Sequence, residues 1–200
     1  MKYIKLDKIG IIMNKNEIRK LLKNKRLNQS KDEVLAKSKQ IKNRLFQIDE
    51  FKKAKNILFY VSYDGEVFTH DAIKKAFIDK KVVVPISNKE DYSLILSKLY
   101  SFEDLGEGPY GILEPKKEKI KEISIDEIDL IIVPGIGFDL KGNRIGHGKG
   151  FYDRLLKNTN VPIIALAFEF QIIEKIPVDE HDKPVDIIIT EKRIIYCKDP

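Results

Sequence analysis

The sequence predicts a single-domain α/β protein with a three-layer, Rossmann-like fold, in which a largely parallel sheet is flanked by helices. Short, continuous apolar runs such as 56–61 and 130–133 are typical of strands buried on both faces. Amphipathic helical stretches alternate with these runs, as the crossovers between parallel strands require. The 200 residues contain no internal repeat and no linker. We therefore expect one domain over 14–200, preceded by an extension over 1–13.

Three helices are expected in the first part of the chain, each after a capping residue. Asn14 is a typical N-cap, and Ser30 with Glu33 has the spacing of a capping box. The first expected helix begins at Asn14, the second covers about 31–48, and the third covers 70–80 after Thr69.

The remaining strands are expected from their β-branched and apolar composition, at 81–85, 92–99, 161–167, 185–190 and 193–196. The last of these is expected to form a hairpin. A turn-rich segment over 106–115 is expected to be a loop over the site, and the charged segment 116–128 to be mostly loop.

The segment from Asp129 to Asp153 is the centre of the functional prediction. Its buried strand ends at a Pro-Gly pair, and five of the eleven glycines follow before the next expected helix: Gly137, Gly142, Gly146, Gly148 and Gly150. In such an arrangement, backbone N–H groups and a helix N-terminus can bind phosphate. Arg144 and Lys149 add positive charge, and Asp153 adds a carboxylate that suits Mg²⁺. We interpret this glycine loop as an anion site, for a nucleotide phosphate.

Two standard phosphate motifs do not match the glycine loop. A Walker A motif needs Ser or Thr after Gly-Lys, but Gly150 follows Lys149. A dinucleotide fingerprint needs Gly-x-Gly-x-x-Gly, and the spacing from Gly146 to Gly150 is one residue short. A plain glycine-rich surface turn is the alternative, and it accounts less well for two cations among so many glycines.

Four further residues are candidates for the same site. Lys15 and Arg19 are four apart on one helix, so they share a face and could hold phosphate oxygens. Glu66 follows the first strand, at the edge of an open α/β sheet where ligands bind. Asp182 could join Asp153 as a second hard oxygen ligand for a metal. For each of these side chains, a solvated surface position is the alternative.

A zinc site is a weaker alternative for the histidines. It would need His70, His147 and His181, and no two of these have ligand spacing. His147, inside the glycine loop, is instead expected to contact a phosphate or another ligand.

The composition limits the classes of function. The net charge is +6, but residues 1–31 carry a net +8 and the rest carries a net −2. The basic character thus belongs to one segment, which an anionic small molecule explains as well as nucleic acid does. The lone Cys197 excludes an internal disulfide and favours a reducing, cytoplasmic location. We see no membrane span and no signal peptide.

The glycine loop also carries a family resemblance. The run from Pro134 to Asp153, PGIGFDLKGNRIGHGKGFYD, resembles the signature of 5-formyltetrahydrofolate cyclo-ligases, also called 5,10-methenyltetrahydrofolate synthetases. Other segments that resemble this family are Lys15 with Arg19, Gly65-Glu66-Val67, 111–115, and His181-Asp182 with 184–186. The resemblance covers about 14–190, nearly the whole chain.

This resemblance implies an enzyme that uses ATP and Mg²⁺ to convert 5-formyltetrahydrofolate into 5,10-methenyltetrahydrofolate. It implies catalytic roles for Arg144 and Lys149, and metal binding by Asp153 and Asp182. The implied ATP-binding residues are Lys15, Arg19, Arg144, Ile145, Gly146, His147, Gly148, Lys149, Gly150, Phe151 and Tyr152. The implied substrate-binding residues are Val61, Glu66, His147, Gly148, Lys149, Gly150 and Phe151.

Two positions depart from the family pattern. Phe151 stands where many relatives have Tyr, and Phe68 replaces a more usual acidic or polar residue near Glu66.

The expected partners are small molecules, without nucleic acid or membrane. A monomer is expected, with a dimer as the alternative.

Two other function classes remain as alternatives from the residues alone. One is a phosphate-binding enzyme of similar layout, such as a sugar-phosphate isomerase or an acyl-CoA transferase, which would act without ATP. The other is a nucleic-acid-binding module that uses the basic N-terminal helix, with affinity that falls steeply with salt.

Overall fold

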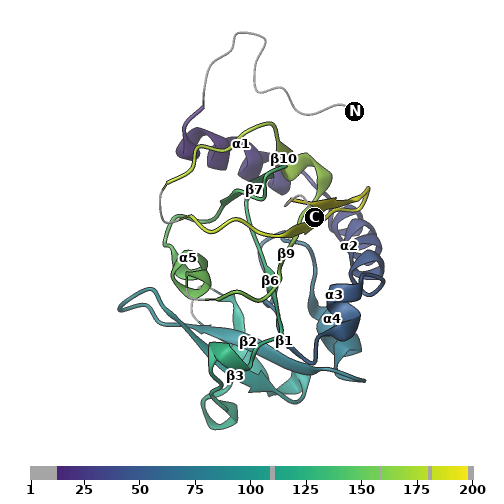
Figure 1. The fold of residues 1–200 in the computed structure, drawn as a ribbon, viewed down its shortest axis with the longest axis vertical. Coiled ribbons are helices and arrows are strands. Elements are labelled where there is room, and N and C mark those ends of the chain that lie inside the picture. The colour runs from purple at the N-terminus through teal and green to yellow at the C-terminus, as the bar shows by residue number, and fades with distance from the viewer. Residues whose placement is uncertain (1–12, 109–110, 158, 180–181, 198–200) are drawn as a thin grey trace.

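A computed structural model describes residues 13–108, 111–157, 159–179 and 182–197, and Figure 1 shows its fold. The expected extension therefore lies outside the described residues, apart from Met13. No helix among the described residues is both long and apolar enough to span a bilayer.

Five α-helices form among the described residues: α1 (Lys15–Leu27), α2 (Lys31–Leu45), α3 (Asp49–Lys53), α4 (His70–Ala76) and α5 (Phe151–Leu156). The first two begin at complete capping boxes, in which the side chains of Asn14 and Ser30 accept backbone N–H bonds. The predicted helix over 31–48 was too long, because α2 ends at Leu45 and the short α3 follows. Helix α4 is also shorter than predicted. Thr69 precedes it without a side-chain cap, since its hydroxyl donates to the Tyr60 carbonyl.

A seven-stranded sheet runs through the molecule in the order β12-β11-β9-β6-β1-β2-β3. Its strands are β1 (Asn56–Leu58), β2 (Lys81–Ser87), β3 (Leu94–Leu99), β6 (Leu130–Val133), β9 (Ile163–Leu166), β11 (Ile187–Ile189) and β12 (Ile194–Tyr196). The five inner strands pair in parallel, and the two edge strands, β3 and β12, pair antiparallel. The predicted α/β class, the largely parallel sheet and the final hairpin are therefore confirmed.

The strand order changes direction at β1, in the interior of the sheet. β1 lies between β2 and β6, so the chain leaves β1 towards one edge and later returns to its other side. In open α/β sheets, ligands bind beyond the carboxyl ends of the strands at such a switch point. The segments that follow β1 and β6 are therefore the expected walls of a site.

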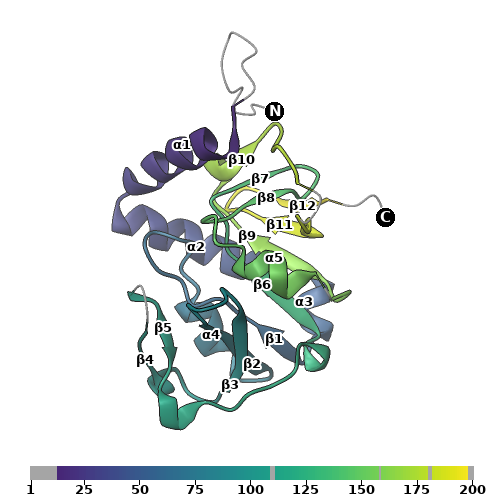
Figure 2. The same ribbon diagram turned by 90° about the vertical axis from the view of Figure 1, so that its left-hand side faces the viewer.

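Two smaller sheets complete the fold. β10 (Ile172–Ile173), β7 (Gly137–Asp139) and β8 (Arg144–Ile145) form the first, so the glycine loop is partly strand. β4 (Leu105–Glu107) and β5 (Leu113–Pro115) form the second, an antiparallel hairpin where a loop was expected. It lies beside β2 and β3 of the main sheet in Figure 2, and the N–H of Ser87 at the end of β2 donates to Glu114 of β5.

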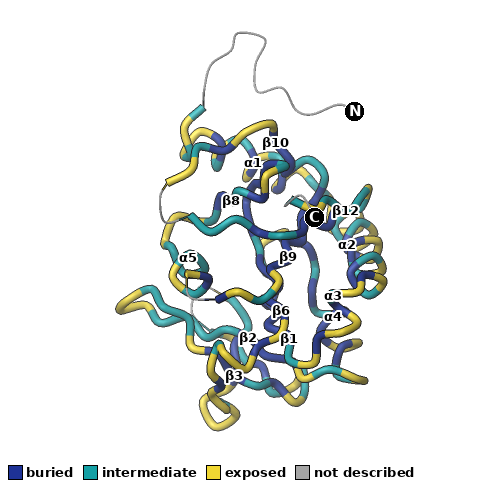
Figure 3. The backbone as a smooth tube through the Cα atoms, in the orientation of Figure 1, coloured by how far each residue is buried: buried dark blue, intermediate teal, exposed yellow. Residues whose placement is uncertain are grey.

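Strands β6 and β9, near the middle of the central sheet, are buried along their whole length and are dark blue in Figure 3. Alternate strand residues pack on one face against α2, α3 and α4, and on the other against α5 and β7. A third apolar cluster joins α1 to the glycine-loop sheet through Ile18, Leu22 and Ile145. Helix α1 is thereby fixed beside the loop that follows β6.

Candidate active site

A cavity of about 490 Å³ lies at the switch point of the sheet. Its wall includes Tyr60 and Val61, which follow β1, and Pro134 and Gly135, which follow β6. The β4–β5 hairpin contributes Leu113 and its neighbours. The cavity is therefore where the strand order predicts a ligand site.

Every residue that the sequence analysis assigned to the site lines this one cavity. The residues come from four separate segments: Lys15 and Arg19 of α1, Val61 and Glu66 after β1, the run from Arg144 to Asp153, and Asp182 near the end of the chain. The structure thus brings the predicted residues together, while their individual roles stay predictions.

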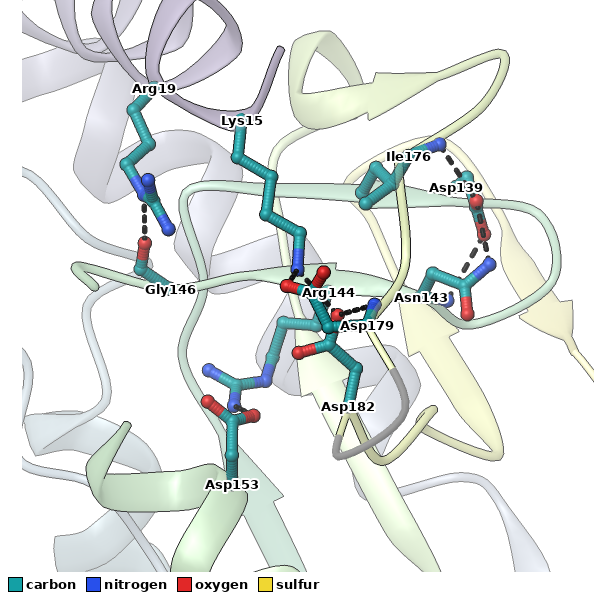
Figure 4. A network of polar contacts seen from close by, with 10 residues as sticks. All are labelled: Lys15, Arg19, Asp139, Asn143, Arg144, Gly146, Asp153, Ile176, Asp179 and Asp182. Atoms are coloured by element: carbon teal, nitrogen blue, oxygen red, sulfur yellow. Dashed lines mark hydrogen bonds and ion pairs between the residues drawn. The ribbon is translucent and has the colours of Figure 1, made fainter. Parts of the chain in front are cut away.

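Lys15 links helix α1 to the segment that contains Asp179 and Asp182. Its ammonium donates to the Oδ2 atoms of Asp179 and Asp182, at 2.6 and 2.5 Å (Figure 4). Burial lowers the pKa of Lys15, but the two carboxylates outweigh this effect and raise the pKa above its ordinary value. Burial raises the pKa of Asp182, but the hydrogen bonds from Lys15 and from the backbone N–H of Asp179 outweigh this effect and hold that pKa below its ordinary value. Both groups are charged at neutral pH.

Arg144 is the most buried cation of the cavity. Its side chain is 5 % exposed, and Nη2 donates to Asp153 Oδ1 at 2.6 Å. The guanidinium lies over the Tyr152 ring, 5.6 Å from its centre. Among the residues that the structure describes, Arg144 Nε is buried without a hydrogen-bond partner. This N–H is a buried donor whose hydrogen-bonding capacity is unused, on a residue that lines the cavity.

The tip of the glycine loop is held from both sides. Arg19 Nε donates to the Gly146 carbonyl at 2.9 Å, and Arg154 Nη1 donates to the Lys149 carbonyl at 2.8 Å. Gly150 precedes α5 with φ of 75°, a left-handed conformation that favours glycine. The Lys149 ammonium itself is exposed and lies 5.1 Å from the centre of the Tyr92 ring.

Asp139 fixes the base of the glycine loop, although it does not line the cavity. This buried carboxylate accepts from the backbone N–H groups of Lys141, Asn143 and Ile176, and from the Asn143 side chain. The bond to Ile176 ties the loop to the segment that leads to Asp179 (Figure 4). One buried carboxylate therefore links the glycine loop to the segment that leads to Asp179 and Asp182.

Glu66 is the carboxylate that follows β1. It is buried, and its Oε2 accepts from the Tyr63 N–H at 3.3 Å. Its Oε1 lies 3.8 Å from His147 Nε2, so the turn after β1 meets the tip of the glycine loop. The Tyr63 ring lies 6.0 Å from the His147 ring. These groups form a polar and aromatic corner of the cavity.

Sequence reasoning missed several lining residues: Tyr60, Tyr63, Pro85, Ser87, Leu94, Glu114 and Asp179. Glu114 lies in the segment expected to cover the site, and its buried carboxylate accepts from the Ser87 N–H at 2.9 Å. Asp179 lies three residues before Asp182 in a polar segment, and this spacing was a signal that could have been used. The β2–β3 residues carry no local signal, because only strand pairing brings them to the cavity.

The donor set of the cavity fits Mg²⁺ that is bound together with a phosphate. Mg²⁺ is usually held by one or two carboxylates, with phosphate and water oxygens as the other ligands. Asp153 and Asp182 both line the cavity, and Asp153 is partly exposed. The described residues contain no group of three or more side chains that could hold a metal alone. His70 contacts the Ser62 carbonyl outside the cavity, and His181 lies outside the described residues, so nothing in the described part supports a zinc site.

Comparison with known proteins agrees with this geometry. Residues 11–191 match the model of the 5-formyltetrahydrofolate cyclo-ligase family. The 5-formyltetrahydrofolate cyclo-ligase of Mus musculus is 33% identical over 189 residues, which cover 88% of this chain and 93% of that protein. The enzyme of the same name from Haemophilus influenzae is 35% identical over 148 residues, covering 70% of this chain and 78% of that protein.

The fold is similar to that of a solved relative. The NMR structure of Aquifex aeolicus 5,10-methenyltetrahydrofolate synthetase has a TM-score of 0.83 and 36% identity, and the match covers 94% of this chain and 95% of that one. The family match spans the four segments that build the cavity. The chain therefore belongs to the 5-formyltetrahydrofolate cyclo-ligase family.

Proposed function

We propose that the protein catalyses the ATP- and Mg²⁺-dependent cyclisation of 5-formyltetrahydrofolate to 5,10-methenyltetrahydrofolate, with release of ADP and phosphate. One observation carries the proposal: a single cavity gathers four cations, five carboxylates and a glycine loop at the switch point of the sheet. The cations are Lys15, Arg19, Arg144 and Lys149, and the carboxylates are Glu66, Glu114, Asp153, Asp179 and Asp182. This set suits a polyanionic nucleotide next to an uncharged ring system that carries hydrogen-bond donors.

The proposed reaction has two steps. The formyl oxygen of the substrate takes the γ-phosphoryl group of ATP, which releases ADP and converts a poor leaving group into a good one. N10 then attacks the activated formyl carbon and loses its proton, and the C–O bond to phosphate breaks. The product is the five-membered ring with inorganic phosphate. Neither step needs a protein nucleophile, and the cavity offers no Cys–His or Ser–His pair among the described residues.

Phosphoryl transfer depends on positioning and on neutralised charge rather than on covalent chemistry by the protein. In this proposal, Lys15 and Arg19 hold ATP phosphates from α1, and the loop from Arg144 to Tyr152 surrounds them with N–H donors. Arg144 and Lys149 stabilise the charge that develops during transfer. The buried, unpartnered Nε of Arg144 supports this role, because a residue that lines the cavity keeps one donor unused.

Asp153 and Asp182 would hold Mg²⁺ in the proposed complex. When bound, the ion neutralises phosphate charge and orients the transferred group. Lys15 and Arg144 contact these two carboxylates in the structure, so both cations must share or leave their partners when a metal–nucleotide complex enters.

Glu66 and Val61 bind the folate ring in this proposal, with the loop from His147 to Phe151 against its other side. Glu66 offers carboxylate oxygens to ring N–H donors, and Phe151 and Tyr63 offer aromatic faces. The hydroxyl absent from Phe151 leaves stacking as the contact available at that position.

The test combines purified protein with 5-formyltetrahydrofolate, ATP and Mg²⁺ and follows the near-ultraviolet absorbance of the methenyl product. We expect a rise that requires both ATP and the metal. A rise without ATP would refute phosphorylation of the formyl oxygen as the activating step. No rise, with folate binding intact, would leave a relative that binds folate without catalysis. No rise and no folate binding would refute the proposal.

A further inference from the structure

A buried arginine outside the cavity contacts the turn that carries Glu66. Arg26 lies in the last turn of α1, and its side chain is only 4 % exposed. It does not line the cavity. The same helix supplies Lys15 and Arg19 to the cavity, and its apolar residues Ile18 and Leu22 pack on the glycine-loop sheet.

The anionic partners of Arg26 are two carboxylates of one turn. Its Nη2 donates to Asp64 Oδ2 at 3.1 Å, and its Nη1 lies 4.0 Å from Glu66 Oε1. Within the described part of the chain, Nη1 is buried and makes no hydrogen bond. The guanidinium thus spans both sides of the turn, with Asp64 bonded directly and Glu66 held by charge.

The backbone of this turn is itself constrained. Asp64 has φ of 45° and Gly65 has φ of 71°, so two successive residues adopt the left-handed region. For a residue other than glycine this conformation is uncommon and costs energy, which surrounding contacts must offset. A Cβ on Gly65 would lie 3.3 Å from Arg26 Cγ, so the arginine stem packs directly on the turn. The arginine therefore contacts the turn along its length.

The energetics argue against packing as the main role of this arginine. A buried guanidinium is costly to desolvate, and an apolar side chain of similar size often replaces a buried ion pair without loss of stability. The desolvation cost of a buried guanidinium is consistent with a role in which its charge fixes the position of another group. Here that group is Glu66, since Asp64 is largely exposed and needs no buried partner.

We propose that Arg26 is a positioning residue that holds the Tyr63–Glu66 turn, so that the Glu66 carboxylate faces the cavity and can accept donors of the folate ring. The inference rests on the proposed function and deepens its substrate side. Arg26 would act through Glu66 and would not touch the substrate. Because Glu66 Oε1 also lies 3.8 Å from His147, the same contact keeps the folate side of the cavity against the glycine loop.

The first experiment compares Arg26→Met with Lys23→Met. Lys23 is an exposed charge on the same helix, so its variant controls for the loss of one positive charge. Binding of 5-formyltetrahydrofolate is measured by equilibrium dialysis without ATP, and binding of ADP is measured separately. We expect the Kd for folate to rise about tenfold in Arg26→Met, a loss of about 1.4 kcal/mol, with the Kd for ADP changed less than about twofold. Lys23→Met is expected to bind both ligands as the unchanged protein does.

A double-mutant cycle separates positioning from general structural support. In a Glu66→Gln background, Arg26→Met should weaken folate binding by less than about twofold, because the group that it positions is already altered. Full additivity of the two substitutions, or equal weakening of folate and ADP, would overturn the inference. Arg26→Lys keeps the charge and should recover most of the folate affinity.

Two further arms keep the result decisive. If Arg26→Met does not fold, Asp64→Asn removes the charge from the directly bonded partner on an exposed position that tolerates positive φ. We expect this variant to weaken folate binding selectively, and unchanged folate binding would overturn the inference. If the unchanged protein binds no 5-formyltetrahydrofolate, the proposed function fails with the inference. If it binds and all Arg26 and Asp64 variants match it, only the inference fails.

Discussion

Arg144 Nη2 and Asp153 Oδ1 lie 2.6 Å apart, which joins the strand β8 to the first turn of α5 across the tip of the glycine loop. The pair encloses the residues from Ile145 to Tyr152, so it bridges the two ends of the tip of the loop. Arg144 has a second N–H, at Nε, that is buried without a partner among the described residues. Nε and Nη2 lie on the same edge of the guanidinium, so Asp153 occupies one donor of that edge and leaves its neighbour unused.

Arg144→Ala should remove most of the turnover. Loss of a fixed cation that stabilises transition-state charge typically lowers kcat by about 10²–10³-fold, or roughly 3–4 kcal/mol. Arg144→Lys should recover little, because an ammonium cannot contact Asp153 and a ligand with a planar fork. Steady-state kinetics with both substrates measures the effect. Arg44→Ala, a change at a partly exposed arginine on α2 that does not line the cavity, is the matched control. Near-normal kcat in Arg144→Ala would contradict the assignment.

Lys149→Ala should lower kcat with less effect on stability. Its ammonium is exposed and its nearest described aromatic partner is Tyr92, at 5.1 Å from the ring centre, so little packing is lost. We expect kcat to fall by about 10²-fold and the melting temperature to stay close to that of the unchanged protein. Tyr92→Leu keeps the lysine and removes its aromatic partner, and should retain most activity. A large loss in Tyr92→Leu with normal Lys149→Ala would reverse the assignment.

Gly150→Ala should weaken ATP binding. Gly150 has φ of 75°, and a Cβ there would lie 2.9 Å from Arg154 Nη1, the donor that holds the Lys149 carbonyl. The left-handed conformation alone costs an alanine about 1–2 kcal/mol. Gly111→Ala is the matched control, because Gly111 has φ of 73° and open space around its Cβ position. We expect both variants to lose similar stability in thermal unfolding, and only Gly150→Ala to raise the KM for ATP. Equal KM values would contradict the role of this loop.

His70 should make the protein less stable in mild acid. Its ring lies between Phe68 and Phe102, and burial lowers the pKa of His70 below its ordinary value of 6.5. The unfolded chain then binds a proton at higher pH than the folded chain does. The contribution of His70 to the free energy of unfolding is fully present above the ordinary pKa and is lost as the pH drops through and below that value. Melting temperatures from about pH 7.5 to 5.5 should fall more steeply in the unchanged protein than in His70→Gln. Parallel curves would refute this explanation.

The sheet could be predicted because its strands are continuous apolar runs, and the helix starts could be predicted because Asn14 and Ser30 are local signals. The structure departs where the signal is short or distant. The five residues of α3 are too few to show a helical period, and the β4–β5 hairpin forms in a segment that reads as turns. Tyr92, predicted as strand, adopts φ of 58° and lies in the turn before β3.

The site residues could be predicted because the glycine loop is a long motif and because the resemblance supplied the distant segments. Their partners could not be predicted. Lys15 contacts Asp179 and Asp182 across more than 160 residues of chain, and no local pattern announces such a pairing. In the sequence, Arg26 is one more basic residue of a lysine-rich segment, and only its burial in the structure distinguishes it from Lys23 or Lys25.

Helix α1 also works as a spacer between two halves of the cavity. Arg26 lies eleven positions after Lys15, and at 1.5 Å per residue their backbones stand about 16 Å apart along a rigid axis. The distance between the carboxylates near Lys15 and the turn near Arg26 is therefore set by a count of residues. Deleting one residue between them would shorten this spacing slightly but rotate one set of side chains by about 100° relative to the other. Changes in the length of α1 should consequently be far less tolerated than changes in its exposed side chains.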